Sequence, residues 1–276
     1  MASMFENQVV IITGAGRGIG AAAARSFGEL GAAVVVSDRD AAPAEDIVAA
    51  ITSAGGRAIG VAGDITDPVF PDKLVGATIE AFGALHVLVN NAGYTWDGML
   101  HKMTDKQWEA MLAVHNTAPF RLVRAAAPHM RDAAKREEAE GRGPAPRCII
   151  NVSSTSGLHG NIGQLNYATA KMGLVGFTKT IAKEWGPFNI RCNAVAFGYI
   201  ETRLTQAKET GESITVDGEE VHLGVPGHMH DFVKMMIPLG RTGTVEEAAG
   251  GILLLASPWA SYINGHTLEV TGGMGI

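Results

Sequence analysis

The stretch that decides the fold is "TGAGRGIG", residues 13–20, which follows the β-branched run "QVVII" and precedes the apolar series "AAAARSF". Glycines let a backbone turn approach a phosphate closely, and the start of a helix presents free N–H groups and a partial positive charge to an anion. The turn therefore predicts a site for the pyrophosphate of a dinucleotide. The spacing of Gly14, Gly18 and Gly20 departs by one place from the commonest dinucleotide fingerprint, so the turn alone is a weak signal.

Short β-branched runs recur along the chain, each bounded by glycine, asparagine or aspartate, and stretches with helical spacing of apolar residues separate them. This alternation predicts an α/β fold, a Rossmann-type doubly wound parallel sheet with helices on both faces, in a single domain spanning residues 1–276. The expected strands lie at 8–14, 32–38, 58–64, 85–93, 147–154, 190–198 and 266–273.

Two segments interrupt this alternation. The charged segment 131–146 joins a helix to a strand, so we expect it beside the amino ends of the strands. The segment 203–237 leaves the carboxyl end of a strand, where ligands bind in open α/β sheets, and we expect it to form a substrate lid. Within it, Asp217-Gly218 stands between two alternating runs and predicts a β-hairpin.

Composition excludes several classes of protein. The net charge of -6 and the pI near 5.8 provide no basic field for nucleic acid. The longest apolar runs fall short of the roughly 20 residues that span a bilayer, and the first residues lack the charged region of a signal peptide. We expect a cytoplasmic protein without nucleic-acid or membrane partners, in which Cys148 and Cys192 are buried free thiols.

Further motifs follow the glycine-rich turn in a fixed order: "NNAG" at 90–93, Asn116 in "VHNTAPF", "NVSSTSG" at 151–157 and "YATAK" at 167–171. With these motifs the chain resembles the short-chain dehydrogenase/reductase family over nearly its whole length. In segments such as "GQLNYATAK" and "IPLGRTG" its sequence is most similar to the β-ketoacyl-ACP reductase branch. The resemblance implies an NAD(P)-dependent oxidoreductase that moves hydride between a nicotinamide and a carbonyl or secondary alcohol. It assigns the catalytic roles to Asn116, Ser154, Tyr167 and Lys171.

Tyr167 and Lys171 are four residues apart in an expected helix and so share a face. We expect the lysine ammonium and an oxidised nicotinamide to lower the tyrosine pKa from its usual value of about 10. Tyr167 would then exchange a proton with the substrate oxygen, while Ser154 hydrogen-bonds the same oxygen. The resemblance implies that Asn116 distorts its helix and helps to hold a water linking the lysine to solvent.

Asp38 ends the run "VVVSD" eighteen residues after Gly20, where an acid accepts hydrogen bonds from the ribose of adenosine. A 2′-phosphate there would be repelled by about 1 kcal/mol in water and about 4 kcal/mol at a partly buried site. This position favours NAD(H). Arg17 and Arg39, either of which would pair with that phosphate, keep NADP(H) as the alternative.

The resemblance assigns further cofactor contacts. At Asp64 the alternative is a helix cap for the segment that follows. Phe197 replaces the usual family proline beside the nicotinamide, so we expect a shifted or more flexible pocket with activity retained. The implied cofactor-binding residues besides Arg17, Asp38 and Arg39 are Gly14, Gly18, Ile19, Gly20, Asp64, Ile65, Asn90, Ala92, Gly93, Tyr167, Lys171, Gly198, Ile200 and Thr202.

The lid carries three histidines and three methionines of interest. We expect no metal at His222, His228 and His230, because hydride transfer needs none and no acidic framework accompanies them. The methionines either line an apolar pocket for an acyl chain or pack the lid against the protein. They are Met229, Met235 and Met236.

The expected reaction is the reduction of a 3-oxoacyl thioester carried by ACP or CoA. One alternative is a dehydrogenase of another secondary alcohol (a steroid, sugar or xenobiotic), which the length of the lid favours. Another is a non-catalytic dinucleotide-binding regulatory protein, against which the complete catalytic set argues. The resemblance also implies a homotetramer, with the helices bearing Asn116 and Tyr167 in one interface and the C-terminal "HTLEVTGGMGI" in a second.

Overall fold

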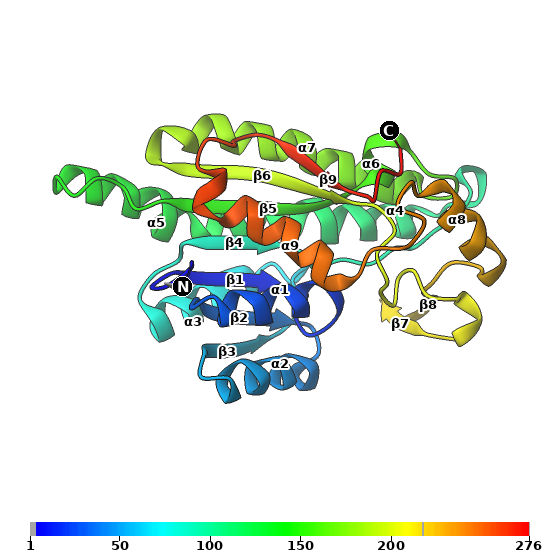
Figure 1. Cartoon of the computed structure of the whole chain (residues 1–276), viewed down its shortest axis with the longest axis horizontal. Coiled ribbons are helices and arrows are strands. Elements are labelled where there is room, and N and C mark those ends of the chain that lie inside the picture. Colours follow the sequence, from blue (N-terminus) through cyan, green and yellow to red (C-terminus); the bar gives the residue numbers. More distant parts are fainter. Residues whose placement is uncertain (1–3, 217, 276) are drawn as a thin grey trace.

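A seven-stranded parallel sheet forms the centre of the computed structural model, which describes residues 4–216 and 218–275 (Figure 1). Its strands are β1 (Val9–Thr13), β2 (Ala33–Asp38), β3 (Arg57–Ala62), β4 (Val87–Asn90), β5 (Arg147–Ser154), β6 (Ile190–Phe197) and β9 (Thr267–Val270). The order β3-β2-β1-β4-β5-β6-β9, with every neighbouring pair parallel, is that of a doubly wound sheet. The predicted fold class and all seven predicted strands are confirmed.

Helices cover both faces of the sheet. The α-helices are α1 (Gly18–Glu29), α2 (Ala41–Ser53), α3 (Phe70–Phe82), α4 (Asp105–Leu112), α5 (Ala118–Ala139), α6 (Thr155–His159), α7 (Leu165–Trp185), α8 (His230–Met236) and α9 (Val245–Ala256). Successive strand residues point to opposite faces. In β1, Val10 and Ile12 therefore pack with α1, α2 and α9, whereas Ile11 packs with α3, α5 and α7. Burial on both faces explains why the central strands are continuous apolar runs.

Shorter helical turns connect these elements. The π-helical turn η2 (Ala113–Thr117) joins α4 to α5. The 3-10 turns are η1 (Leu100–Lys102), η3 (Gly186–Phe188), η4 (Lys208–Thr210), η5 (Gly227–Met229) and η6 (Pro258–Ala260). No helix among the described residues combines the length and apolar character needed to cross a membrane. Cys148 and Cys192 are buried free thiols, as expected.

The lid segment 203–237 contains the predicted hairpin, formed by antiparallel β7 (Ser213–Val216) and β8 (Glu219–His222). The hairpin is confirmed, although Asp217 of its turn lies outside the described residues. In Figure 1 the hairpin lies beyond the carboxyl ends of β1 and β2. The lid therefore stands at the end of the sheet where the sequence predicts ligand binding.

The segment 131–146 lies at the opposite end of the sheet, as expected, but it is not a break in structure. Helix α5 continues to Ala139, and only residues 140–146 form a loop before β5. Lysine, arginine and glutamate have high helix propensity, so the charged sequence extends the helix. Figure 1 shows α5 projecting past the amino ends of the strands.

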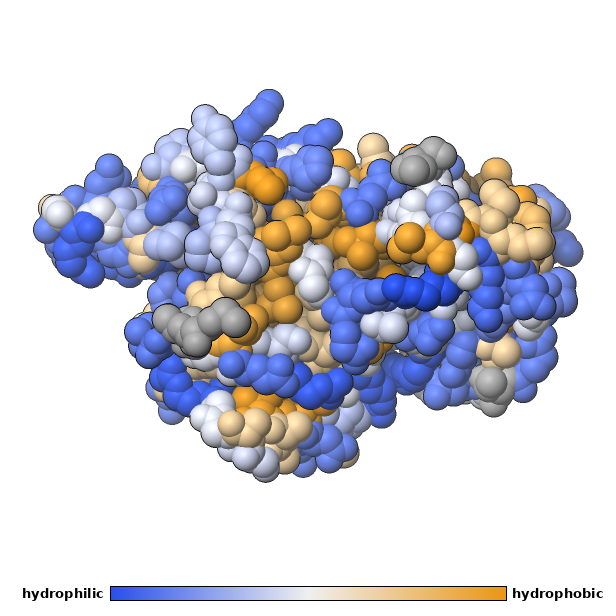
Figure 2. All heavy atoms as spheres, in the orientation of Figure 1, coloured by the Kyte–Doolittle hydropathy of each residue, from blue (hydrophilic) through white to orange (hydrophobic). Residues whose placement is uncertain are grey.

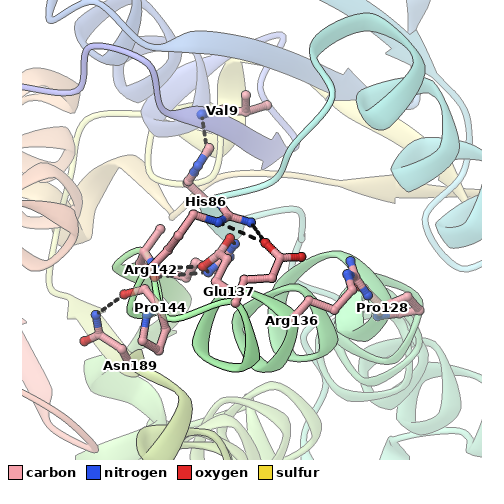
Figure 3. A network of polar contacts seen from close by, with 11 residues as sticks. Val9, His86, Pro128, Arg136, Glu137, Arg142, Pro144 and Asn189 are labelled. Carbon is pink, nitrogen blue, oxygen red and sulfur yellow. Dashed lines mark hydrogen bonds and ion pairs between the residues drawn. The ribbon is translucent and has the colours of Figure 1, made fainter.

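Polar contacts tie this projecting helix to the amino ends of the strands (Figure 3). The carboxylate of Glu137 accepts two hydrogen bonds from Arg147, at 2.5 and 3.0 Å, and one from the backbone N–H of Ala145 at 2.8 Å. These bonds lower the pKa of Glu137 to about 2. Nearby, Nδ1 of His86 accepts the N–H of Val9 at 3.0 Å, so this ring nitrogen carries no proton. The Glu137 bonds fix α5 against the start of β5, and the His86 bond holds the segment before β4 against β1.

We predict that Glu137→Gln lowers the free energy of unfolding by about 3 kcal/mol at pH 7, because the guanidinium of Arg147, 5% exposed, loses its anionic partner. The folded pKa lies below the usual 4.5, so the ionised carboxylate stabilises the fold above pH 4.5. That contribution is lost as the pH falls toward 2. Urea unfolding at pH 7 and pH 3 measures both effects. Glu138→Gln, at an exposed neighbour on α5, is the control. An equal loss of unfolding free energy in the two variants would mean that the ion pair with Arg147 does not stabilise the fold.

Candidate active site

A cleft of about 1270 Å³ opens at the carboxyl ends of the strands. It brings together most of the residues that the sequence singles out, although these come from segments far apart in the chain. Asn90 and Asn116 do not line it. Those that do are Gly14, Arg17, Gly18, Ile19, Gly20, Asp38, Arg39, Asp64, Ile65, Ala92, Gly93, Ser154, Tyr167, Lys171, Gly198, Ile200 and Thr202.

The glycine-rich turn packs tightly against the end of β4. Gly14 has φ +63°, a left-handed conformation that favours glycine. A side chain at Gly20 would place its Cβ 2.3 Å from the carbonyl oxygen of Gly14 and 2.5 Å from Nδ2 of Asn91. That amide group donates to the carbonyl of Thr13 at 2.8 Å. The turn therefore brings the first residues of α1 to the cleft, where their N–H groups suit a pyrophosphate.

At the end of β2, Asp38 organises the rim of the cleft. Its Oδ2 accepts the N–H of Gly16 at 2.9 Å, and its Oδ1 accepts the N–H of Asp40 at 3.1 Å. Asp40 forms an ion pair with Arg17 at 2.8 Å. Arg39 donates to the carbonyl of Thr215 at 2.9 Å. Both arginines therefore have partners within the protein, and Asp40, which sequence reasoning missed, stands only two residues after Asp38.

Two other predicted cofactor residues have clear local partners. Oδ1 of Asp64 accepts the N–H and the hydroxyl of Thr66, at 2.8 and 2.7 Å. The alternative that Asp64 caps a helix is wrong, because α3 begins only at Phe70. Asn90 is 5% exposed and donates to Oδ1 of Asn151 at 2.8 Å, inside the sheet. Its neighbour Asn91, which the sequence analysis did not single out, lines the cleft instead.

Ser154, Tyr167 and Lys171 meet beside the cleft. Ser154 ends β5, while Tyr167 and Lys171 lie one turn apart in α7, so the predicted shared face is confirmed. The Nζ of Lys171 lies 5.5 Å from the centre of the Tyr167 ring and donates to the carbonyl of Val152 at 2.8 Å. The hydroxyl of Ser154 lies close enough to that of Tyr167 to influence its pKa. The three side chains present a hydroxyl pair backed by a buried amine.

The protonation of this group differs from the expectation. Burial raises the pKa of Tyr167 to about 12; the nearby Ser154 hydroxyl opposes this rise, and the charge of Asp97 adds to it. Burial also lowers the pKa of Lys171 to about 7, so its ammonium is partly neutral near pH 7. In the protein alone the pKa of Tyr167 is therefore not lowered, because burial disfavours the charged phenolate. The lowering expected with an oxidised nicotinamide bound stays a prediction. Tyr167 holds its proton at neutral pH.

Asn116 and His115 lie in η2, behind Tyr167. The π-helical turn is the helix distortion expected at Asn116, whose Nδ2 donates to the carbonyl of Ala170 at 2.9 Å. Its Oδ1 is buried without a partner among the described residues, which suits the water that the resemblance implies; that role stays a prediction. His115 was missed, although it directly precedes Asn116. Its ring meets that of Tyr167 edge to face at 5.2 Å and braces it.

Apolar residues of the lid form one wall of the cleft that Ser154 and Tyr167 also line. Met229 lines the cleft, whereas Met235 and Met236 are 77% and 56% exposed on α8. Of the three methionines, Met229 thus fits the pocket-lining alternative, whereas Met235 and Met236 neither line the cleft nor pack the lid against the protein. No group of three His, Cys, Asp or Glu side chains within residues 4–216 and 218–275 is arranged to hold a metal ion. Other apolar residues of this wall are Leu204, Val225, Val233 and Met274.

Phe197, which replaces the family proline, is accommodated within the sheet. It is 6% exposed, ends β6, and packs with the core on the α1 and α9 face. The next residue, Gly198, donates its N–H to the carbonyl of Val270 at 3.0 Å, which holds the turn against β9. This backbone pairing restrains the turn where the fixed φ of proline is absent. The expected shift or flexibility of the pocket stays a prediction.

Comparisons with known proteins agree with this geometry. The family model "short chain dehydrogenase" matches residues 8–213. The chain is 38% identical to "Short-chain reductase protein NovJ" of Streptomyces niveus, with 97% of this chain and 94% of that protein covered. It is 35% identical to the 3-oxoacyl-[acyl-carrier-protein] reductase FabG of Escherichia coli, with 98% of each covered. A short chain dehydrogenase from Burkholderia cenocepacia, solved in complex with NADP, superposes with a TM-score of 0.83 at 28% identity over 99% of this chain and 100% of that one.

We predict that Gly20→Ala weakens NADH binding at least about tenfold, because an added Cβ would force the turn away from Gly14 and Asn91 and displace the start of α1. Fluorescence titration with NADH measures the dissociation constant. Gly76→Ala is the matched control, since a Cβ on that glycine of α3 meets nothing within 4 Å. Unchanged affinity in a folded Gly20→Ala variant would mean that the dinucleotide does not use this turn.

Proposed function

Because the chain belongs to the short-chain dehydrogenase family, we propose that it is a nicotinamide-dependent oxidoreductase that reduces a 3-oxoacyl thioester carried by ACP or CoA. The meeting of Ser154, Tyr167 and Lys171 in the cleft that the glycine-rich turn opens carries this proposal. The same cleft thus has groups suited to a dinucleotide and groups suited to a carbonyl oxygen.

The residues of the cleft fit a nicotinamide dinucleotide. The start of α1 suits its pyrophosphate, and the carboxylate of Asp38 suits the ribose of its adenosine half. When bound and reduced, the nicotinamide supplies a hydride to the substrate carbon. Gly198 and Thr202 line the same cleft and would hold the carboxamide side of the cofactor.

The proton of the reduction comes from Tyr167. Ser154 and Tyr167 both hydrogen-bond the carbonyl oxygen and so stabilise the negative charge that develops on it as hydride reaches the carbon. Tyr167 then gives its proton to that oxygen, and the product is an alcohol. The raised pKa suits this direction, because the tyrosine enters the reaction protonated. Lys171 and the predicted water at Asn116 would return a proton to the phenolate.

Two observations support a thioester substrate. The similar proteins of Synechocystis sp. and Escherichia coli are named 3-oxoacyl-[acyl-carrier-protein] reductases, and each covers nearly the whole chain. The apolar wall that Leu204, Val225 and Met229 provide suits an acyl chain. The same wall favours, as a second candidate, another apolar secondary alcohol such as a steroid. A non-catalytic regulatory role is the least supported, because the catalytic side chains meet in one place.

We favour NAD(H) over NADP(H). Asp38 lines the cleft where a 2′-phosphate would lie, and the two arginines that would attract that phosphate are held by Asp40 and by the carbonyl of Thr215. The Burkholderia cenocepacia protein was solved with NADP, so the family alone does not decide between NAD(H) and NADP(H). Our preference for NAD(H) depends on the residues at the rim of the cleft.

We also propose that residues 1–276 form one domain and assemble as a homotetramer. Phe120 on α5 and Met172 on α7 are 48% and 50% exposed on helices expected in one interface. Figure 2 shows a band of hydrophobic surface over α9 and β9, beside the expected second interface, where Trp259 is 77% exposed. Light scattering at micromolar concentration checks the assembly, and a monomer would contradict it. A cytoplasmic location stays a prediction from the sequence.

We predict that Tyr167→Phe lowers kcat for the reduction of acetoacetyl-CoA by about a thousandfold, since general acid catalysis contributes 10²–10⁴-fold. NADH absorbance measures turnover in a panel of acetoacetyl-CoA, steroids and polyols. Tyr262→Phe, at a fully exposed tyrosine, is the matched control. Turnover of a steroid or polyol without any thioester would replace the first candidate by the second. Unaltered turnover in Tyr167→Phe would exclude the mechanism.

We predict that kcat/KM is higher with NADH than with NADPH, and that Asp38→Ala narrows the ratio by about tenfold because it removes the repulsion of the 2′-phosphate. Steady-state kinetics with both cofactors measure this ratio. The control is Asp46→Ala, at an exposed acid of α2 that does not line the cleft. A wild-type preference for NADPH would refute the assignment.

A further inference from the structure

The β7–β8 hairpin is the tip of an arm that leaves the carboxyl end of β6. Backbone hydrogen bonds join the outgoing and returning chains along the arm: Lys208 N–H to Val225 O and Leu223 N–H to Glu212 O, each at 2.9 Å. In the hairpin itself, Val216 and Val221 are 9% and 3% exposed. Because its two chains are paired from base to tip, the arm acts as one element rather than as a loose loop.

The tip contacts the rest of the protein at two places, one of them at the nucleotide end of the cleft. At this end, Nη1 of Arg39, directly after β2, donates to the carbonyl of Thr215 at 2.9 Å. At the other place, Nζ of Lys106 in α4 forms an ion pair with Glu219 at 2.7 Å. The hairpin therefore links the end of β2 to α4.

The hairpin also forms part of the cleft. Ile214, Thr215 and Val216 line the same cavity as Asp38 and Asp64, the residues suited to the adenosine half of the cofactor. The substrate wall comes from other parts of the lid, chiefly the residues near Leu204 and Met229. One excursion of the chain thus provides two walls, one for the substrate and one for the nucleotide.

The contacts that close the hairpin are of a kind that can open. The side chains of Arg39, Lys106 and Glu219 are 47%, 37% and 57% exposed, and exposed ion pairs are weak. The Arg39 contact uses the backbone carbonyl of Thr215, so it depends on the position of the hairpin rather than on the identity of that residue. Such contacts slow the departure of a ligand without preventing it.

We propose that the β7–β8 hairpin is a strap across the nucleotide end of the cleft, which holds the bound dinucleotide and limits the rate of its release. The proposal rests on the proposed function, because it requires a dinucleotide in the cleft. It goes beyond that function by giving part of the lid a role toward the cofactor. The strap then slows cofactor release without taking part in hydride transfer.

Stopped-flow fluorescence tests the proposal, with NADH preloaded and displaced by excess NAD⁺. Glu219→Gln removes the ion pair with Lys106, and we expect the NADH dissociation rate to rise about threefold. Replacing residues 214–221 by a short glycine-serine linker removes both contacts, and we expect at least about a tenfold rise. Single-turnover hydride transfer should stay unchanged in Glu219→Gln, because Glu219 does not line the cleft.

The control is Glu220→Gln, which makes the same charge change on the same strand. The carboxylate of Glu220 accepts a hydrogen bond from Ser213 of the same hairpin, so this variant leaves the ion pair between Glu219 and Lys106 in place. Removing a negative charge near an anionic ligand should by itself slow its release, so faster release in Glu219→Gln cannot be an effect of charge alone. If both variants fold and release NADH at the wild-type rate, the strap is excluded while the proposed function stands. If the wild-type protein binds neither NADH nor NADPH, both fail.

Discussion

The close approach of the glycine-rich turn to the end of β4 is the constraint on which the site depends. The hydroxyl of Thr13 accepts the N–H groups of Asn91 and Ala92, each at 3.0 Å, and the amide of Asn91 donates back to the carbonyl of Thr13 at 2.8 Å. These bonds lock β1 to β4, and they leave room only for glycine at position 20. These hydrogen bonds thereby set the positions of the start of α1 and of the rim of the cleft at Asp38.

Burial controls the chemistry at the other end of the cleft. It makes the Tyr167 phenol a weaker acid and the Lys171 amine a weaker base, so both favour their neutral forms in the protein alone. A positive charge on the nicotinamide after hydride transfer would favour the phenolate and so assist the step in which Tyr167 loses its proton. Tyr167 is thus suited to donate a proton during reduction. We favour NADH as the hydride donor because Asp38 lies at the rim of the cleft.

Local pattern predicted much of this protein, because the required residues are close in sequence or repeat with a fixed period. The β-branched runs gave the seven strands, the four-residue spacing placed Tyr167 beside Lys171, and Asp217-Gly218 marked the hairpin. The site residues that the sequence did not predict are those whose role depends on which side of a strand or turn they face. Asn91 rather than Asn90 lines the cleft because successive residues at the end of β4 face different ways. The contact of Arg39 with Thr215 joins residues 176 positions apart, which no local pattern predicts.

A crystal structure of the protein with NADH tests most directly whether the cleft holds a dinucleotide beside the catalytic side chains. We expect the pyrophosphate at the start of α1, the adenosine ribose on Asp38 beneath the β7–β8 hairpin, and the nicotinamide C4 facing the substrate position beside Ser154 and Tyr167. A dinucleotide bound outside the cleft, or one whose nicotinamide lies away from Tyr167, would contradict this expectation.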